Sequence, residues 1–303
     1  MIDILIINYN TVLPLAALLD ALTRWEKPIY SRRAEYQITV VDNGSLDGSV
    51  EMVAHRFPQV RILARPTNGG YAVAVNEGIA ATKQSEILIL NSDILIPPDA
   101  VARLVRIWER LDCHGIVAPL HLEEDNFPQL TWGVFPSWRA EWRRKRLERG
   151  LARRQEWARQ AVLAECCATR QVDWVSGSCL FFPRTLAEAV GPWDPRFFLY
   201  FEDIDWCLRA RRAGYAIYHT AEVQVRHCHG ASMRSAPVRA ELEYRRSQCY
   251  FTQKYYGRWR LRLIQVYLSG KLMGRWIRGK GSGFRRKDSW KIIKHLWRRP
   301  GEE

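Results

Sequence analysis

The chain has 303 residues, of which 47% are hydrophobic and 12% aromatic, a composition that excludes a disordered protein and allows a large core. The formal net charge is +14 and the sequence pI is near 9.7, which favours an anionic partner. No stretch approaches the roughly 18 apolar residues of a membrane span, and the beginning lacks a secretory signal, so we expect a cytoplasmic protein. The seven cysteines show no C-x-x-C spacing and are expected to be reduced core thiols.

The first part of the chain alternates short apolar runs with amphipathic segments. The runs predict buried strands at 2–7, 38–41, 60–63 and 87–90, and the segments predict helices at 13–25, 50–56, 72–81 and 100–111. Alternation of this kind is typical of an α/β fold with a mostly parallel sheet, covered by helices on both faces.

Each predicted strand ends in a polar loop, and the loops carry Asn8, Asp42, Asn68 and Asp93. Open parallel sheets bind ligands beyond the carboxyl ends of their strands, so these side chains are expected at one edge. No glycine-rich dinucleotide or P-loop motif is present, which argues against a dehydrogenase or a P-loop NTPase. A divalent cation would then neutralise phosphate charge, and Asp93 is a candidate ligand.

The middle of the chain departs from the alternation. We expect a helical, basic, Trp-rich insertion at about 121–171 over the ligand-binding edge of the sheet. Later segments predict sheet at 172–182, a helix at 206–213 capped by Gly214, strands at 216–218 and 223–225, and a helix at 241–256 closed by Gly257.

An acidic group, Glu202, Asp203 and Asp205, follows an aromatic run and precedes the helix predicted from Trp206. Free N–H groups at a helix start stabilise carboxylates as anions, whereas aromatic walls exclude water and raise the pKa. Such a position suits a catalytic base. The alternative is a solvated helix start whose acids only complement the helix dipole.

Basic residues concentrate in two blocks, at 139–159 and 258–299, the second interleaved with tryptophans. Basic and aromatic segments attract either nucleic acid or the acidic cytoplasmic face of a membrane. We expect residues 258–303 to form a helical tail that associates with a membrane, which would make the protein peripheral on the inner face of the cell membrane.

The order and spacing of seven segments resemble the family 2 glycosyltransferases of GT-A fold, in particular the rhamnosyltransferase-like group. The segments are IINYN, VDNGSLDGS, NGGYAVAVNEGI, LNSDILIPPDA, VDWVSGSCLFFPR, FFLYFEDIDWCLRARRAGY and HCHGAS. The resemblance covers roughly residues 2–257 and implies a GT-A (Rossmann-like) domain over 1–257, followed by the tail.

The resemblance implies a metal-dependent, inverting sugar transfer from a nucleotide diphosphate sugar to a saccharide or lipid-linked saccharide. The favoured donor is dTDP-rhamnose, with a UDP-sugar next, and the cofactor is Mg²⁺ or Mn²⁺. The implied roles are catalytic base for Asp203, nucleotide-sugar binding for Tyr9, Asn10, Asp42, Asn68, Asn91 and Ser92, metal binding for Asp93 and His227, and acceptor or structural support for Glu202, Asp205 and Trp174.

Asn91 is a departure, since many relatives have an aspartate there, and an amide brings the metal no charge. His229 is the alternative metal ligand if the register of its loop differs. Two other functions remain open from the sequence. A basic nucleic-acid-binding protein would leave the acidic and amide loops unexplained, because acids repel phosphate. An inactive glycosyltransferase-like scaffold is suggested by Asn91 alone.

Overall fold

The computed structural model describes residues 1–23, 35–112, 114–135, 138–166, 168–227, 237–278 and 286–297. His229 and the glycines at 279, 281 and 283 lie outside these ranges. Within the described part of the chain, no helix combines the length and the apolar character needed to cross a membrane. The four cysteines that the structure describes there are buried free thiols, as expected: Cys166, Cys179, Cys207 and Cys249.

The predicted alternation of strands and helices is confirmed over the first part of the chain. The strands are β1 (Ile2–Asn8), β2 (Tyr36–Asp42), β3 (Arg61–Ala64) and β4 (Glu86–Asn91). The helices are α1 (Val12–Thr23), α2 (Ser49–Arg56), α3 (Tyr71–Ala81) and α4 (Ala100–Arg110). All pairings among these four strands are parallel, in the order β3-β2-β1-β4, so their carboxyl ends share one edge.

The sheet continues with strands that follow β4 in the chain. These are β5 (Ile94–Leu95), β6 (Ile116–Leu122), β8 (Arg170–Gln171), β10 (Cys179–Pro183) and β11 (Ile217–His227). The full order is β3-β2-β1-β4-β10-β6-β11-β5, with β8 on β11. Strand β10 runs antiparallel between β4 and β6, so the sheet is mixed, and the predicted α/β class is confirmed.

Three boundaries differ from the sequence prediction. The strands expected at 216–218 and 223–225 are one strand, β11, whose register shifts between Thr220 and Gln224, because a bulge absorbs the intervening residues. The sheet expected at 172–182 is divided, since β9 (Trp174–Val175) pairs with β7 (Trp132–Gly133) in a separate ribbon. Helix α8 (Glu202–Arg212) begins earlier than the predicted Trp206.

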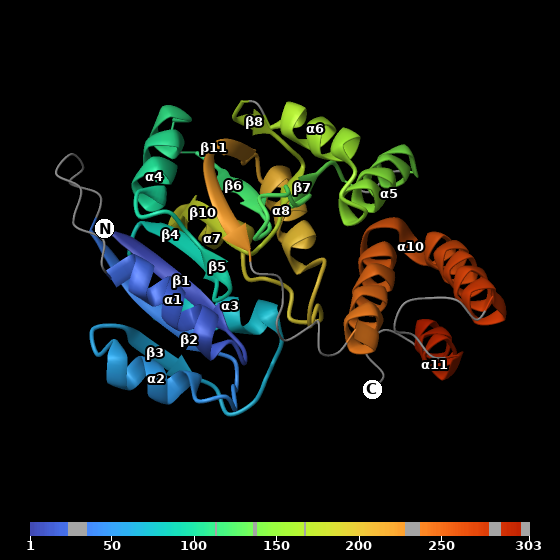
Figure 1. Cartoon of the computed structure of the whole chain (residues 1–303), viewed down its shortest axis with the longest axis horizontal. Helices are drawn as coiled ribbons and strands as arrows, with labels where there is room; N and C mark the ends of the chain where they lie inside the picture. Colours follow the sequence, from blue (N-terminus) through green and yellow to red (C-terminus); the bar gives the residue numbers. More distant parts are fainter. Residues whose placement is uncertain are drawn as a thin grey trace.

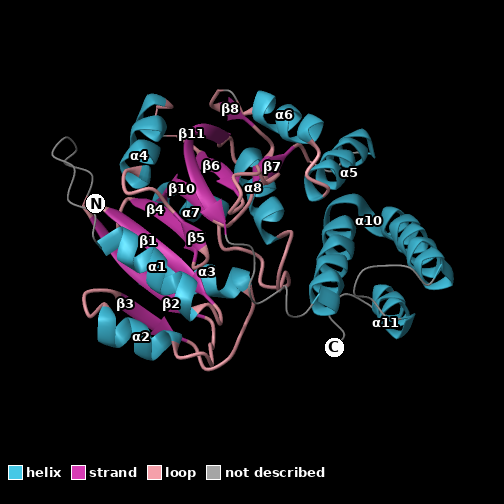
Figure 2. Cartoon of the chain, viewed as in Figure 1, coloured by secondary structure: helices cyan, strands magenta, loops and turns pink. Residues whose placement is uncertain are grey.

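Helices cover both faces of the sheet, as Figures 1 and 2 show. Helices α1, α2 and α4 pack on one face, where α1 contributes the predicted row Leu15, Leu18, Leu19 and Leu22. Helices α3, α7 (Arg184–Val190) and α8 pack on the other. Burial of these two apolar layers is the main stabilising term.

Two helical regions are added to this α/β body. The insertion contains α5 (Trp138–Ala152) and α6 (Glu156–Glu165), and the C-terminal part contains α10 (Pro237–Arg278) and α11 (Arg286–Leu296). In Figure 2, α10 and α11 lie beside the sheet and outside its layers. Helix α10 is broken at Gly257, whose φ of 80° is non-helical, as expected for a glycine that closes the preceding helix.

Candidate active site

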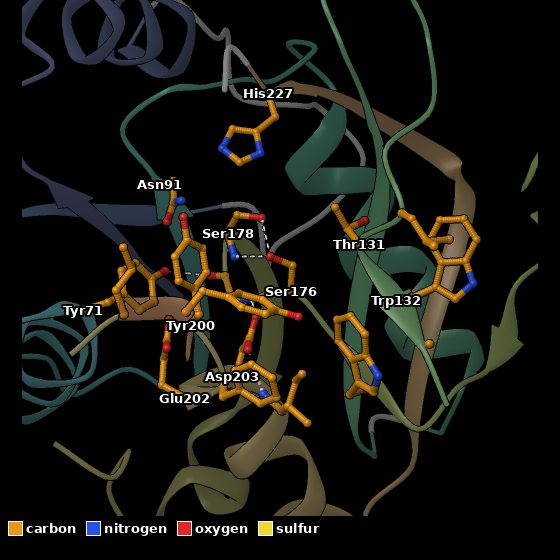
Figure 3. Close-up of a pocket in the computed structure, with 18 of the residues that line it drawn as sticks. Tyr71, Asn91, Thr131, Trp132, Ser176, Ser178, Tyr200, Glu202, Asp203 and His227 are labelled. Atoms are coloured by element: carbon orange, nitrogen blue, oxygen red, sulfur yellow. Dashed lines mark hydrogen bonds between the residues drawn. The ribbon is translucent and has the colours of Figure 1, made fainter. Parts of the chain in front are cut away.

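A large cleft, about 2170 Å³ in volume, opens where β1 and β4 end. Its walls come from the loops after these strands, from the insertion, from the start of α8 and from the first part of α10. Figure 3 shows Asn91 and His227 on one side of this cleft, Glu202 and Asp203 on the other, and Ser176 and Ser178 between them. The cleft therefore brings together groups separated by more than a hundred residues in sequence.

The polar loop ends of β1 and β2 meet in a dense hydrogen-bond network. The Asn8 amide donates to Asp42 Oδ2 at 2.7 Å, and the Ser45 backbone N–H donates to Asp42 Oδ1 at 2.8 Å. The backbone N–H of Asn10 donates to Ser45 Oγ, and Asn10 Oδ1 accepts from the Leu46 N–H. These contacts fix the loops before any ligand arrives.

Asp42 is only 1% exposed, and both its carboxylate oxygens accept bonds from the protein. Its predicted contact with a nucleotide base stays a prediction. The neighbouring Asn43 lines the cleft and its amide donates to Asn68 Oδ1 at 3.0 Å. Asn68 also caps the approach to α3, because its Oδ1 accepts the Gly70 N–H. Tyr9 lies in the cleft wall.

Ser92 belongs to the same network from the side of β4. Its hydroxyl lies 2.6 Å from that of Thr11, which in turn donates to Asn8 Oδ1. The four loop ends predicted to share an edge are thus linked: Asn8 bonds to Asp42 and, through Thr11, to the loop after β4, and Asn43 bonds to Asn68 in the loop after β3. This linkage preorganises the wall of the cleft that Tyr9, Asn68 and Ser92 line.

A strained turn aims the acidic group of α8 into the cleft. Tyr200 and Phe201 both have φ of 68°, a left-handed conformation that bulky residues rarely adopt. Phe201 packs with Phe197 and Phe251 in a buried aromatic cluster, and the Ser247 hydroxyl of α10 donates to the Leu199 carbonyl. These contacts hold the turn, which delivers Glu202 and Asp203 at the first positions of α8.

Asp203 is oriented by two backbone donors. Its Oδ2 accepts the Gly177 N–H at 3.1 Å and its Oδ1 accepts the Ile204 N–H at 2.8 Å. Burial raises the pKa of the Asp203 carboxyl above its usual range, while these two bonds and the positive charge of Arg144 limit the rise. A carboxylate with a raised pKa is a stronger base, and both oxygens retain lone pairs for a ligand.

Glu202 is buried, with 5% of its surface exposed, and its Oε2 accepts no hydrogen bond from the described residues. Burial first, and then the neighbouring Asp203, hold the pKa of Glu202 well above the ordinary glutamate value. The rise favours the protonated form of Glu202 relative to an exposed glutamate, and in that form the carboxyl is a hydrogen-bond donor.

Asp205 is held by several side chains of the protein, and its predicted role in acceptor binding or structural support stays a prediction. The side chain is fully buried and accepts bonds from Arg209 Nε at 2.9 Å and from the Tyr255 hydroxyl at 2.7 Å. Lys254 also donates to it. These partners consume its lone pairs and fasten α8 to the end of the first segment of α10, so Asp205 does not face a ligand.

Asp93 and His227 lie together, with His227 Nε2 at 3.2 Å from Asp93 Oδ1. Among the residues described, no three His, Cys, Asp or Glu side chains gather to form a complete metal cluster. The oxygen Asn91 Oδ1 is buried and accepts no hydrogen bond from that same part of the chain. A carboxylate, an imidazole and an amide oxygen are suitable ligands for Mg²⁺ or Mn²⁺. Oxygens of a bound diphosphate would complete the coordination shell of such a cation.

Several residues of the cleft were missed by sequence reasoning. The Tyr71 hydroxyl donates to the Gly177 carbonyl at 2.8 Å, so one peptide segment contacts both Tyr71 and Asp203. The Ser178 hydroxyl lies 2.9 Å from Nε2 of the buried His121, whose ring is 5.8 Å from that of His227. The sequence signal for these contacts was the run of small residues Ser176-Gly177-Ser178, because small side chains permit close packing between the two sides of the cleft.

The insertion side of the cleft is aromatic and basic. Trp174 is buried, donates from Nε1 to the Val134 carbonyl at 3.1 Å, and lies under the Arg144 guanidinium at 4.6 Å. Arg144 donates in turn to the Leu130 and Trp132 carbonyls. The predicted supporting role of Trp174 thus fits a wall residue that positions Arg144 near Asp203.

Comparison with known proteins agrees with this geometry. Residues 3–175, more than half of the chain, match the family described as Glycosyl transferase family 2. The chain belongs to this family, and the resemblance inferred from its motifs is confirmed.

Among curated relatives, an N-acetylglucosaminyl-diphospho-decaprenol L-rhamnosyltransferase of Mycobacterium tuberculosis is 28% identical over 246 residues, which cover 74% of this chain and 76% of that protein. A low-salt glycan biosynthesis hexosyltransferase, Agl10, of Haloferax volcanii is 26% identical over 61% of this chain and 57% of its own length. The rhamnosyltransferase-like character expected from the motifs is therefore confirmed.

Solved structures with the same fold include the mannosyltransferase PcManGT of Pyrobaculum calidifontis, in complex with GDP-Man and Mn²⁺. It is 16% identical, with a TM-score of 0.54, over 82% of this chain and 61% of that one. Staphylococcus aureus TarS has a TM-score of 0.53 at 12% identity and covers 97% of this chain and 42% of its own. These likenesses confirm the expected GT-A-like fold.

Proposed function

We propose that this chain transfers rhamnose from dTDP-rhamnose, with inversion, to a hydroxyl of a saccharide carried on a lipid diphosphate. The observation that carries the proposal is the position of Asp203, oriented by Gly177 across the cleft from Asn91 and His227. The mycobacterial relative, which covers most of both chains, supports the choice of sugar and acceptor. A UDP-sugar is the second candidate for the donor.

The chemistry is one displacement at the anomeric carbon. Asp203 takes the proton of the acceptor hydroxyl, whose oxygen bonds to that carbon as the bond to the diphosphate oxygen breaks and the nucleoside diphosphate leaves. Asp93 and His227, with Asn91 beside them, would hold the divalent cation, which supplies positive charge for the leaving diphosphate.

A retaining double displacement needs a second, ionised carboxylate as nucleophile. Asp205 is unsuitable because Arg209, Lys254 and Tyr255 bind it. Glu202 is poorly suited because burial and the neighbouring Asp203 raise its pKa, which disfavours the ionised form that a nucleophile needs. Neither neighbour of Asp203 can form a glycosyl-enzyme, which supports inversion.

The test is thermal stabilisation by dTDP, UDP and GDP and by their sugar conjugates, each with and without Mn²⁺ or Mg²⁺. A ligand that binds only the folded state raises the melting temperature with the logarithm of its concentration. We expect the largest shift with the dTDP series in the presence of metal, and a smaller one in Asp93→Ala. Equal, metal-independent shifts for all nucleotides, or none, would overturn the proposal.

A further inference from the structure

The second segment of α10, after the break at Gly257, has one face committed to packing inside the protein. Leu261, Leu268 and Leu272 are buried against Ile292, Ile293 and Leu296 of α11. The Gln265 amide, on the same face, donates to the Leu296 carbonyl at 2.6 Å. This helical pair therefore has its own small core, and the opposite face of α10 is left for solvent or a partner.

That opposite face is apolar. Its exposed side chains are Trp259, Leu263, Val266, Tyr267 and Met273, of which Trp259 is 85% and Leu263 70% exposed. Successive helical residues are rotated by about 100°, so these five positions lie within a stripe about 120° wide. We name them the apolar stripe. A stripe this exposed is unusual on a surface that water alone covers.

Cations border the apolar stripe on both sides. On the same helical projection, the exposed Arg258 and Arg262 lie along one edge, and the exposed Arg260 and Lys271 lie along the other. Residues 258–278 contain no aspartate or glutamate. An apolar face edged by lysine and arginine is the pattern of helices that lie in the plane of a membrane interface.

Helix α11 extends the same surface. Trp297 is 44% exposed, its indole N–H donates to Ser269 Oγ at 3.0 Å, and Arg262 lies 5.4 Å from its ring. Tryptophan at such an edge suits the headgroup region, where its ring is apolar and its N–H polar. Figure 1 shows this pair of helices at the end of the molecule away from β3 and α2.

We propose that the apolar stripe and its bordering cations dock on a lipid bilayer that contains anionic headgroups. The stripe would lie at the boundary between headgroups and acyl chains, and the cations would lie at the phosphates. Charge complementarity favours this occupant. A second copy of the same surface would bring cation against cation, since residues 258–278 carry no acid to pair with them. A nucleic acid would place charged phosphates against the apolar stripe, which is unfavourable.

The docking surface is joined directly to the cleft. Lys254 and Tyr255, just before Gly257, bind Asp205 of α8, and Tyr244 of the same helical segment lines the cleft. If the proposed function holds, docking would bring the cleft to the surface from which a lipid-linked acceptor is presented. The docking itself does not depend on that function.

The experiment is flotation of the full chain with vesicles, measured without substrate so that it is independent of sugar transfer. Vesicles of phosphatidylcholine mixed with phosphatidylglycerol in equal parts are compared with phosphatidylcholine alone. We expect the chain to bind the anionic vesicles. The combined variant Trp259→Ser, Leu263→Ser, Val266→Ser and Tyr267→Ser is expected to bind them about a hundredfold more weakly, because each side chain loses its transfer free energy.

The matched control replaces exposed apolar residues elsewhere, Leu13→Ser, Leu46→Ser and Trp157→Ser, and is expected to bind as the wild type does. A charge variant, Arg258→Gln, Arg260→Gln, Arg262→Gln and Lys271→Gln, is expected to lower the preference for anionic vesicles by about tenfold or more. Circular dichroism checks that each variant is folded.

Three outcomes would overturn the proposal. The first is no binding of the wild type to anionic vesicles. The second is equal binding by the wild type and a folded stripe variant. The third is a wild type that is dimeric in lipid-free solution and becomes monomeric in the stripe variant, since the stripe would then be an interface between copies.

Discussion

Two buried carboxylates, both close to the cleft, have different environments. Asp42, at the end of β2, is 1% exposed and accepts bonds from the Asn8 amide and the Ser45 N–H. Glu202, at the start of α8, is 5% exposed, and its Oε2 accepts no bond from the described residues. Both side chains are buried, but their hydrogen bonding differs.

The difference matches the proposed division between a wall that binds the donor and a wall that carries the catalytic base. Hydrogen bonds satisfy both carboxylate oxygens of Asp42, so this side chain is part of a rigid wall. The pair Glu202 and Asp203 is desolvated without full compensation, and burial raises the pKa of both carboxyls. Such an environment would suit the proposed catalytic base.

The largest expected effect is on turnover, in Asp203→Asn. Asparagine keeps the shape of the side chain but cannot accept the acceptor's proton, so kcat is expected to fall by about 10³-fold. Donor affinity, set across the cleft, is expected to stay within about threefold of the wild type. A variant that loses donor binding and turnover together would show that Asp203 holds the donor and is not the base. The measurements are steady-state kinetics and calorimetric titration of the donor.

The next effect is on stability, in Asp42→Ala. Removal of this carboxylate leaves the Asn8 amide and the Ser45 N–H without their acceptor, so the free energy of unfolding is expected to fall by about 3 kcal/mol. Donor binding is also expected to weaken. The control is Asp99→Ala, at an exposed carboxylate that makes no capping hydrogen bond, where about 0.5 kcal/mol or less is expected. Urea denaturation measures the free energy of unfolding of both variants. Equal losses in Asp42→Ala and Asp99→Ala would contradict the stabilising role assigned to the hydrogen bonds of Asp42.

The smallest effect has the opposite sign, in Glu202→Gln. Because the folded chain binds the Glu202 proton more tightly than the unfolded chain does, stability falls as pH rises from the unfolded pKa, about 4.3, toward the folded one. Glutamine removes that loss, so the free energy of unfolding is expected to increase by about 1 kcal/mol at neutral pH and to match the wild type at acid pH. Exposed Glu188→Gln should change nothing. If Glu202→Gln is less stable than the wild type at neutral pH, the assigned rise in the pKa of Glu202 is wrong.

Much of the fold could be predicted from sequence because its signals are local. The apolar run of β1 and the Leu15, Leu18, Leu19 and Leu22 row of α1 each identify one element and its buried face. Strand β10 could not be placed, because an antiparallel strand inserted between β4 and β6 is a long-range pairing that no local pattern encodes. The bulge in β11 was missed for the same reason.

The site was predictable in composition and only partly in geometry. The convergence of Asn8 and Asp42 follows from parallel strands that end at one edge. The bond from Gly177 to Asp203 and the link from Ser178 to His121 depend on how β10 brings one segment between the two sides. Sequence could not tell that Asp205 points to Lys254, since that contact spans 49 positions.

The pH dependence of kcat, at saturating donor, acceptor and metal, tests whether the carboxylate of Asp203 is the catalytic base. If burial raises the pKa of Asp203 and its ionised form is the base, kcat falls as pH decreases, with a midpoint above the ordinary aspartate value of about 3.9. The residual activity of Asp203→Asn should lack this acid limb. A kcat that stays constant down to the ordinary aspartate range, or an acid limb that persists in Asp203→Asn, would contradict the assignment.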